Sequence, residues 1–240
     1  MHLNKDDDVK NWLWQLIEQN EVYSVYQPIF DIQVNSLFGY EALLRVDKKY
    51  GLNPAELFAM AKKVGLSYEL DMLALQNAIC SFPETERKLF LNVLPSTLLH
   101  PQFFDDFQRL LDRSCILGRQ IMLEINEGEM IANFSPLKDL LQDLRKLQVS
   151  IVLDDVGSGY SMLMMTQLES DMLKIDRFLV EDVDKSEKKQ RVIQLIAELT
   201  ERRAQIVAEG IENEEELRTL QSLGISLGQG YLLGKPEIIK

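Results

Sequence analysis

Two adjacent carboxylates, Asp154 and Asp155, follow a short apolar run and precede a glycine-containing turn in residues 151–160, IVLDDVGSGY. The apolar run is rich in β-branched residues and predicts a buried strand that ends at the two aspartates. Gly157 and Gly159 allow the backbone to turn sharply directly afterwards. Two like charges are costly to bury side by side unless a cation neutralises them. The stretch therefore predicts either a cation site or a solvated turn.

Polar side chains also stand at or near the ends of other predicted strands: Asn92 in 89–93, Glu124 in 120–125, Lys174 in 171–176, Glu209 in 205–209 and Glu41 within 37–46. Taken singly, each has an ordinary interpretation. A glutamate is usually a solvated or ion-paired strand end, an asparagine a hydrogen-bonded core amide, and Lys174 could simply pair with Asp176. Side chains at the carboxyl ends of parallel strands lie near one another, however, so the set together favours a shared site.

These strand-end residues are carboxylates and one amide, a set of oxygen ligands that suits Mg²⁺ or Mn²⁺ rather than Zn²⁺. Five acidic residues are too many for one cation and fit two, which a bridging aspartate would hold roughly 3.5–4 Å apart. Such a pair favours phosphoryl chemistry. Lys174 could orient the water or bind a phosphate oxygen, and Arg45, four residues after Glu41, could pair with phosphate in a bidentate way.

The elements that position these residues alternate along the chain. Strands over 22–32 and 37–46, joined by the turn-like DIQVNS, are expected to be antiparallel, with Pro28 at an edge or irregular position. Helices and strands then alternate, which indicates a mainly parallel sheet. The expected helices begin at Asn53 and Pro101 and cover about 68–79, 135–147, 187–202 and 213–223; the last strand is expected near 229–233.

About eight strands in 240 residues predict an α/β fold, a TIM-like (β/α)8 barrel variant with one antiparallel strand near the N-terminus. We expect a single domain over 22–240. Residues 1–21 are expected to form a helix that packs on it through one apolar face. Glu214 to Glu216 are expected to be the solvated start of a helix.

The net charge of −12 and the lack of a basic run argue against polynucleotide binding. No apolar run approaches the roughly 20 residues that span a bilayer, so we expect no membrane partner. The absence of a signal-peptide pattern and the presence of only two cysteines, Cys80 and Cys115, favour the cytoplasm. Two histidines leave little room for a histidine metal site or Ser-His catalysis.

Eight segments of the chain resemble the EAL domain family in order and approximate spacing. They are YQPIF, EALLR, LFLNVLPSTL, IMLEINE, LDDVGSGYSML, LKIDRFLV, IVAEGIENEEEL and LGISLGQGYLLGKP. The resemblance covers about residues 22–236, and the motif that gives the family its name is intact at Glu41, Ala42 and Leu43. It implies a barrel with one antiparallel strand and a phosphodiesterase that hydrolyses cyclic di-GMP to linear pGpG with Mg²⁺ or Mn²⁺.

The resemblance also assigns roles to residues. The ligands of one ion would be Glu41, Asn92, Glu124 and Asp154, and those of the second Asp154, Asp155 and Glu209. Glu209 has the further role of general base in this family, and the sequence does not choose between the two; Lys174 would position the water, so Glu41, Lys174 and Glu209 are the catalytic candidates. Calcium is expected to inhibit, because its longer and less regular coordination would misplace the water.

Other positions match supporting residues of the family. Glu212 and Gln229 would support the metal site, and Gln27, Arg45, Asp176 and Pro236 would contact substrate. Glu127 resembles the acid that anchors the loop 155–163, which in the family couples dimerisation to metal binding, so a homodimer is expected. The sequence departs from the common pattern at Val156, Ser158, Val46 and Lys62, none of which is a proposed ligand.

Three functional hypotheses follow. An active phosphodiesterase is favoured because no metal ligand is lost. A non-catalytic cyclic di-GMP receptor or protein-interaction module of the same fold is the main alternative. A barrel glycosidase with a carboxylate pair is disfavoured, since it needs no set of asparagine, lysine and many carboxylates and since aromatic platforms are scarce.

Overall fold

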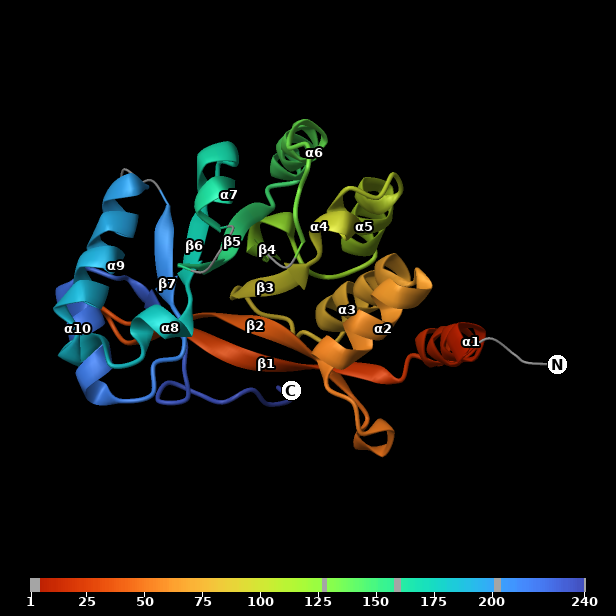
Figure 1. The fold of residues 1–240 in the computed structure, drawn as a ribbon, viewed down its shortest axis with the longest axis horizontal. Helices are drawn as coiled ribbons and strands as arrows, with labels where there is room; N and C mark the ends of the chain where they lie inside the picture. Colours follow the sequence, from red (N-terminus) through yellow and green to blue (C-terminus); the bar gives the residue numbers. More distant parts are fainter. Residues whose placement is uncertain (1–4, 127–128, 158–160, 201–203, 240) are drawn as a thin grey trace.

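The computed structural model describes residues 5–126, 129–157, 161–200 and 204–239. Eight strands close into one barrel in sequence order, and the helices lie around its outside (Figure 1). The strands are β1 Val22–Asp31, β2 Ser36–Val46, β3 Lys88–Val93, β4 Ile121–Ile125, β5 Ser150–Val156, β6 Met172–Ile175, β7 Gln205–Ala208 and β8 Leu227–Gly228. β1 pairs antiparallel with both β2 and β8, and the remaining neighbours are parallel. The expected barrel with one antiparallel strand is confirmed.

The described α-helices are α1 Lys5–Glu18, α2 Pro54–Val64, α3 Ser67–Cys80, α4 Pro95–Leu98, α5 Phe103–Asp112, α6 Ser135–Lys146, α7 Ser161–Gln167, α8 Arg177–Val180, α9 Glu187–Leu199 and α10 Glu214–Ser222. Short 3-10 helices cover Lys48–Tyr50, Gly118–Gln120 and Val183–Lys185. The start of α2 follows its sequence signal, because Asn53 and Glu56 form a reciprocal capping box around Pro54. Within the described residues, every helix is too short or too polar to serve as a transmembrane segment.

Pro28 lies at an irregular position of β1, as expected. On the side of β1 that faces β8, Tyr26 pairs with Glu237 and Phe30 pairs with Gly228. Backbone pairing on this side of β1 is interrupted between these two residues. Pro28 has no N–H to offer a neighbouring strand, and Gly234 packs against its ring instead. The proline therefore sits where the barrel wall needs no backbone donor.

The core has two layers that follow from the alternation of side chains along each strand. One face of the strands fills the barrel interior with Ile29, Phe90, Met122, Val152, Met172, Val207 and Leu227. The opposite face packs under the helices, as with Leu91, Leu123 and Leu153, which are at most 1% exposed. Each interior residue fixes the direction of the side chain two positions along its strand. The interior layer therefore decides which residues reach the mouth of the barrel.

The N-terminal helix α1 buries Leu13 and Leu16 against Leu57 and Leu70 of α2 and α3. The ring of Trp12 meets that of Tyr50 edge-on, with centroids 5.5 Å apart. The helix thus shares a small apolar cluster with the first part of the barrel shell. The division into 1–21 and 22–240 stays a prediction.

The expected last strand near 229–233 is wrong. β8 covers only Leu227–Gly228, and the following residues form turns in which the N–H groups of Leu233 and Gly234 donate to the carbonyl of Gly230. The apolar run Tyr231 to Leu233 suggested a strand, but Gly230 packs directly on the backbone of Ile211, where only a residue without a side chain fits. The chain turns there because this close approach ends the ladder.

Candidate active site

A ring of polar side chains lies directly above the apolar layer inside the barrel. All members except Glu41 stand two positions from an interior apolar residue, as Asn92 does from Phe90 and Glu124 from Met122. The ring consists of Gln27 from β1, Glu41 from β2, Asn92 from β3, Glu124 from β4, Asp154 from β5, Lys174 from β6, Glu209 directly after β7 and Gln229 directly after β8. Every strand of the barrel therefore contributes one polar group to the same place.

Lys174 lies at the centre of this ring and is fully buried. Its Nζ is 2.6 Å from Glu209 Oε1 and 2.8 Å from Glu124 Oε1. It is 3.2 Å from Glu41 Oε2 and 3.5 Å from Asp154 Oδ1. The carboxylates hold the pKa of Lys174 well above its usual value although burial acts to lower it. The simpler pairing of Lys174 with Asp176 is wrong, because Asp176 instead caps α8 by accepting from the Phe178 N–H at 2.7 Å.

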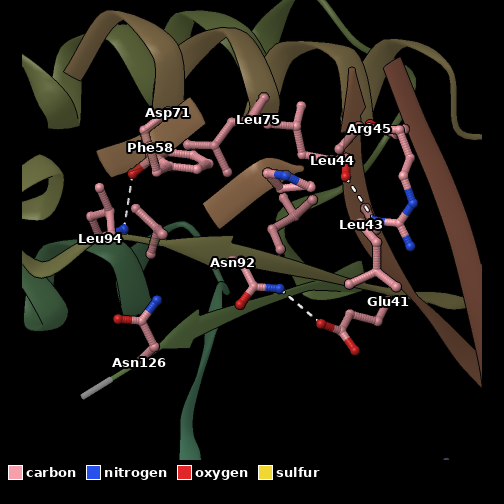
Figure 2. Close-up of a pocket in the computed structure, with 17 residues that line it drawn as sticks. Glu41, Leu43, Leu44, Arg45, Phe58, Asp71, Leu75, Asn92, Leu94 and Asn126 are labelled. Atoms are coloured by element: carbon pink, nitrogen blue, oxygen red, sulfur yellow. Dashed lines mark hydrogen bonds between the residues drawn. The ribbon is translucent and has the colours of Figure 1, made fainter. Parts of the chain in front are cut away.

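Glu41 is fixed by two amide side chains as well as by Lys174. Asn92 Nδ2 donates to Glu41 Oε1 at 2.8 Å, and Gln229 Nε2 donates to Glu41 Oε2 at 2.7 Å (the first bond is drawn in Figure 2). Burial alone would raise the pKa of Glu41, but the charge of Lys174 and these donors outweigh it and lower the pKa. Gln229 Nε2 also donates to Gln27 Oε1 at 3.1 Å, and Gln27 in turn donates to the carbonyl of Gly234.

The negative charges of the other three carboxylates of the ring are less well balanced by positive charges and hydrogen-bond donors. Burial and neighbouring negative charges hold the pKa of Glu124 well above its ordinary value, and burial raises that of Asp154. Burial raises the pKa of Glu209 to about 8. Glu124 Oε2 is buried and has no hydrogen-bond partner among the described residues. One lysine is thus too little positive charge for these groups, and an added cation would stabilise their ionised forms.

Asp154, Asp155 and Glu209 place one carboxylate oxygen each within 4.8 Å of one another. Neighbouring strand residues normally point to opposite faces, but Asp155 adopts φ +55°, in the left-handed region, and the β5–β6 register shifts between Leu153 and Val156. The Asp155 N–H donates to Asp154 Oδ1 at 2.9 Å. The end of the strand is therefore what brings two adjacent aspartates into one cluster.

The donor set fits divalent cations that prefer oxygen. The five carboxylates carry a formal charge of −5 when ionised, and Lys174 reduces it to −4, which two divalent ions would balance. All the side-chain donors other than Lys174 offer carboxylate or amide oxygens, as Mg²⁺ and Mn²⁺ prefer. The unpaired oxygen of Glu124 is a further position where a cation would satisfy a buried group.

A cavity of about 360 Å³ beside the ring is lined by Glu41, Asn92 and Arg45 (Figure 2). Arg45 Nη1 donates to the carbonyl of Leu44 at 2.8 Å. The remaining expected residues lie on nearby loops or on the tail. Glu212 pairs with Arg177 at 2.8 Å, and Pro236 precedes Glu237, whose backbone pairs with Tyr26. Glu127 lies outside the described residues.

Sequence reasoning missed two buried acids that support the site from outside the ring. Asp71 on α3 accepts from the Leu94 N–H at 2.9 Å, two residues after Asn92, and burial raises its pKa to about 7. Glu216 accepts from the Asp182 and Glu212 N–H groups, each at 3.0 Å, and so joins the loops that follow β6 and β7. The expected solvated helix start is wrong for Glu216, which is 3% exposed. Each acid stands four residues before a buried leucine on its helix, and this spacing was the available signal that the acid lies on the buried face.

Fold and site together define a TIM-like barrel with an acidic centre at the carboxyl ends of its strands. The family model described as the EAL domain matches residues 10–236. The chain therefore belongs to the EAL domain family.

Relatives of known name and solved structures agree with this assignment. The chain is 28% identical to "Cyclic di-GMP phosphodiesterase PdeF" of Escherichia coli over 95% of its length and 31% of that protein. It is 31% identical to "Cyclic di-GMP phosphodiesterase PA2567" of Pseudomonas aeruginosa over 89% of its length and 38% of that protein. The chain thus spans about a third of the length of these relatives.

Among solved structures, BlrP1 of Klebsiella pneumoniae in a manganese and cyclic di-GMP complex is 30% identical, with a TM-score of 0.82 over 90% of this chain and 56% of that chain. A second BlrP1 structure is a calcium and cyclic di-GMP complex, with a TM-score of 0.80 over 91% of this chain and 58% of that chain.

Proposed function

We propose that the protein hydrolyses cyclic di-GMP to linear pGpG with the help of two divalent ions, Mg²⁺ or Mn²⁺. The observation that carries the proposal is the polar ring, in which four carboxylates surround a buried Lys174 and Asp155 lies beside two of them, next to a cavity lined by Asn92 and Arg45. The names of the relatives support the choice of substrate. Lowering the level of this second messenger would be the result in the cell.

In this proposal Glu41, Asn92, Glu124 and Asp154 hold one ion, and Asp154, Asp155 and Glu209 hold the second. When bound, the ions would activate water and offset charge on the scissile phosphate. Lys174 is held in place by its carboxylate partners and keeps a full positive charge, so it can orient the attacking water by donating to it. Glu209 serves as a ligand, as the general base, or as both.

The remaining assignments belong to the same proposal. Gln27, Arg45, Asp176 and Pro236 contact the dinucleotide, while Glu212 and Gln229 support the metal site and Glu127 anchors the loop 155–163. Gln229 is supported most directly, since it donates to both Glu41 and Gln27. We also propose that the protein acts as a homodimer in the cytoplasm, where thiols such as the free Cys80 and Cys115 stay reduced.

The alternative function is a cyclic di-GMP receptor or protein-interaction module without turnover. A turnover assay separates the two. With Mg²⁺ or Mn²⁺, the purified protein should convert cyclic di-GMP to pGpG, and chromatography measures the product. Ca²⁺ should inhibit this turnover. Glu41→Ala should lower turnover by more than about 100-fold, because even partners of metal ligands are worth about 10- to 100-fold.

Glu198→Ala, an exposed glutamate on α9, is the matched control and should leave turnover unchanged. Binding of cyclic di-GMP without turnover in both Mg²⁺ and Mn²⁺ would favour the receptor. Turnover with Ca²⁺ equal to that with Mg²⁺ would count against the proposed ligand geometry.

A further inference from the structure

Two cavities at the mouth of the barrel lie next to each other. The cavity of about 360 Å³ beside Arg45 and a second of about 380 Å³ share four lining residues, Phe58, Asn92, Leu94 and Asn126. We call the two cavities together the mouth groove. It runs along α2 and β3, across residues of the polar ring (Figure 2 shows the part beside Arg45).

Each of the two cavities of the mouth groove has a single positively charged residue among the described residues that line it. Arg45 is the one cation in the first cavity, and Lys62 on α2 is the one cation in the second. The acids that line the groove are Glu41 and Asp71 in the first cavity and Glu129, Asp154 and Asp155 in the second. Lys62 is thus the only described cation lining the part of the groove that contains both aspartates.

The ammonium group of Lys62 pairs with one carboxylate of the groove, that of Glu129. Its Nζ is 3.1 Å from Glu129 Oε1, and its side chain is 65% exposed while that of Glu129 is 15% exposed. Glu129 keeps a second partner, since its Oε2 accepts from the Ser96 N–H at 2.9 Å. A lysine ammonium has three donors, so it can keep one partner and donate to another. Lys62 can therefore donate to an anion in the groove while it stays paired with Glu129.

We propose that Lys62 is a substrate contact that donates to a phosphodiester oxygen of the bound cyclic dinucleotide, in the cavity next to the one that Arg45 lines. The inference rests on the proposed function and deepens it. A cyclic dinucleotide carries two phosphodiesters: the two proposed ions would offset the charge of the carboxylates and of one phosphodiester, and a lysine in the adjoining cavity can donate to the other. Lys62 supplies the cation on the α2 side, so it sets affinity rather than the chemical step.

The test compares Lys62 with its neighbour Lys63. Lys63 lies on the same helix with a side chain 64% exposed, but it pairs with Asp6 on α1 and does not line the groove. The variants are Lys62→Met, Lys62→Glu, Lys63→Met and Lys63→Glu. Calorimetry with Ca²⁺ in place of Mg²⁺ measures the dissociation constant for cyclic di-GMP. Turnover assays with Mg²⁺ measure KM and kcat. The melting temperature of each variant shows whether it is folded.

We expect Lys62→Met to raise the dissociation constant and KM roughly five- to tenfold, the scale of a charge-assisted contact, with kcat within twofold. Lys62→Glu should weaken binding further, and the difference from wild type should shrink as salt is added. The Lys63 variants should stay within about twofold of wild type.

Equal affinities for wild type, Lys62→Met and Lys62→Glu, in a protein that binds and cleaves cyclic di-GMP, would overturn this inference and leave the proposed function intact. A loss of kcat without a change in KM would overturn it too, because it would place Lys62 in the chemical step. Failure of the wild-type protein to bind cyclic di-GMP under any metal would overturn both the inference and the proposed function.

Discussion

At the scale of single residues, Lys174 shows how the ring fixes the charge of one group. A fully buried lysine usually loses its proton because burial disfavours the charged form. Here four carboxylates within 3.5 Å hold the pKa of Lys174 well above its ordinary value. Lys174 is therefore a permanent cation at neutral pH, suited to orienting water or phosphate and unsuited to accepting a proton.

Asp71 shows the opposite case, a buried carboxyl that prefers to stay neutral. Its pKa is raised from 3.8 to about 7 by burial, although the Leu94 N–H acts to lower it. Between pH 3.8 and about 7, the Asp71 carboxyl is ionised in the unfolded chain and protonated in the folded protein. The contribution of Asp71 to stability is therefore fully present below about pH 4 and is lost as the pH rises through about 7.

Asp71→Asn should remove this dependence on pH, because asparagine keeps an oxygen for the Leu94 N–H and does not ionise. The free energy of unfolding of the variant, relative to wild type, should rise by about 2 to 3 kcal/mol between pH 5 and pH 8. Urea titrations at the two pH values measure the difference. Asp105→Asn, an exposed position on α5, is the control and should show no such change. A constant difference for Asp71→Asn would contradict the raised pKa.

At the scale of elements, the site is held by loops that are tied to each other. The Ile211 N–H donates to the Gln229 carbonyl at 3.0 Å, and the Leu232 N–H donates to the Ile211 carbonyl at 3.1 Å. These bonds join the loop after β7, which carries Glu209, to the turn after β8, which carries Gln229. Gly230 lies between the two contacts, against the Ile211 backbone.

Gly230→Ala should be strongly destabilising, since its methyl group would overlap backbone atoms of Ile211 that cannot move without displacing the loop. We expect a loss of more than about 3 kcal/mol in the free energy of unfolding, at the upper end of overpacking costs. Gly224→Ala is the control: φ is +81° there, but no atom lies within 4 Å of the added carbon. That change should cost only about 1 to 2 kcal/mol. Equal losses for the two variants, measured by urea unfolding, would argue against a close approach at Gly230.

The same elements show what the sequence could and could not predict. The barrel and the strand ends that carry Asn92, Glu124 and Lys174 were predictable, because alternating apolar residues define both the strand and the direction of each side chain. The length of β8 was not, because Gly230 ends it through a contact with Ile211, which lies 19 residues earlier in the chain. Asp71 and Glu216 were missed for a related reason: their partners are backbone N–H groups of loops that meet only in the folded barrel.

At the scale of the whole molecule, closure of the barrel is what assembles the polar ring. Each of the eight strands, or the residue directly after it, contributes one polar group to the ring, and closure of β8 onto β1 brings Gln229 next to Gln27. Four of the carboxylates behind the net charge of −12 are gathered around Lys174 in this ring, and Asp155 lies beside them. Folding therefore concentrates negative charge that the unfolded chain keeps apart in solvent, which opposes folding until cations are added.

Divalent ions that fill the proposed site should stabilise the whole molecule, because they bind the folded barrel and not the unfolded chain. Saturating Mg²⁺ or Mn²⁺, at about 100 times its dissociation constant, should raise the free energy of unfolding by about 2.7 kcal/mol for each ion bound. The denaturant dependence should stay unchanged, since the surface exposed on unfolding is the same. Urea titrations with Mg²⁺, with EDTA and with NaCl of equal ionic strength measure the effect, and NaCl should reproduce little of it. Glu41→Ala, which removes a ligand from the ring, should reduce the gain; a gain that persists in full would place the ions elsewhere on the acidic surface.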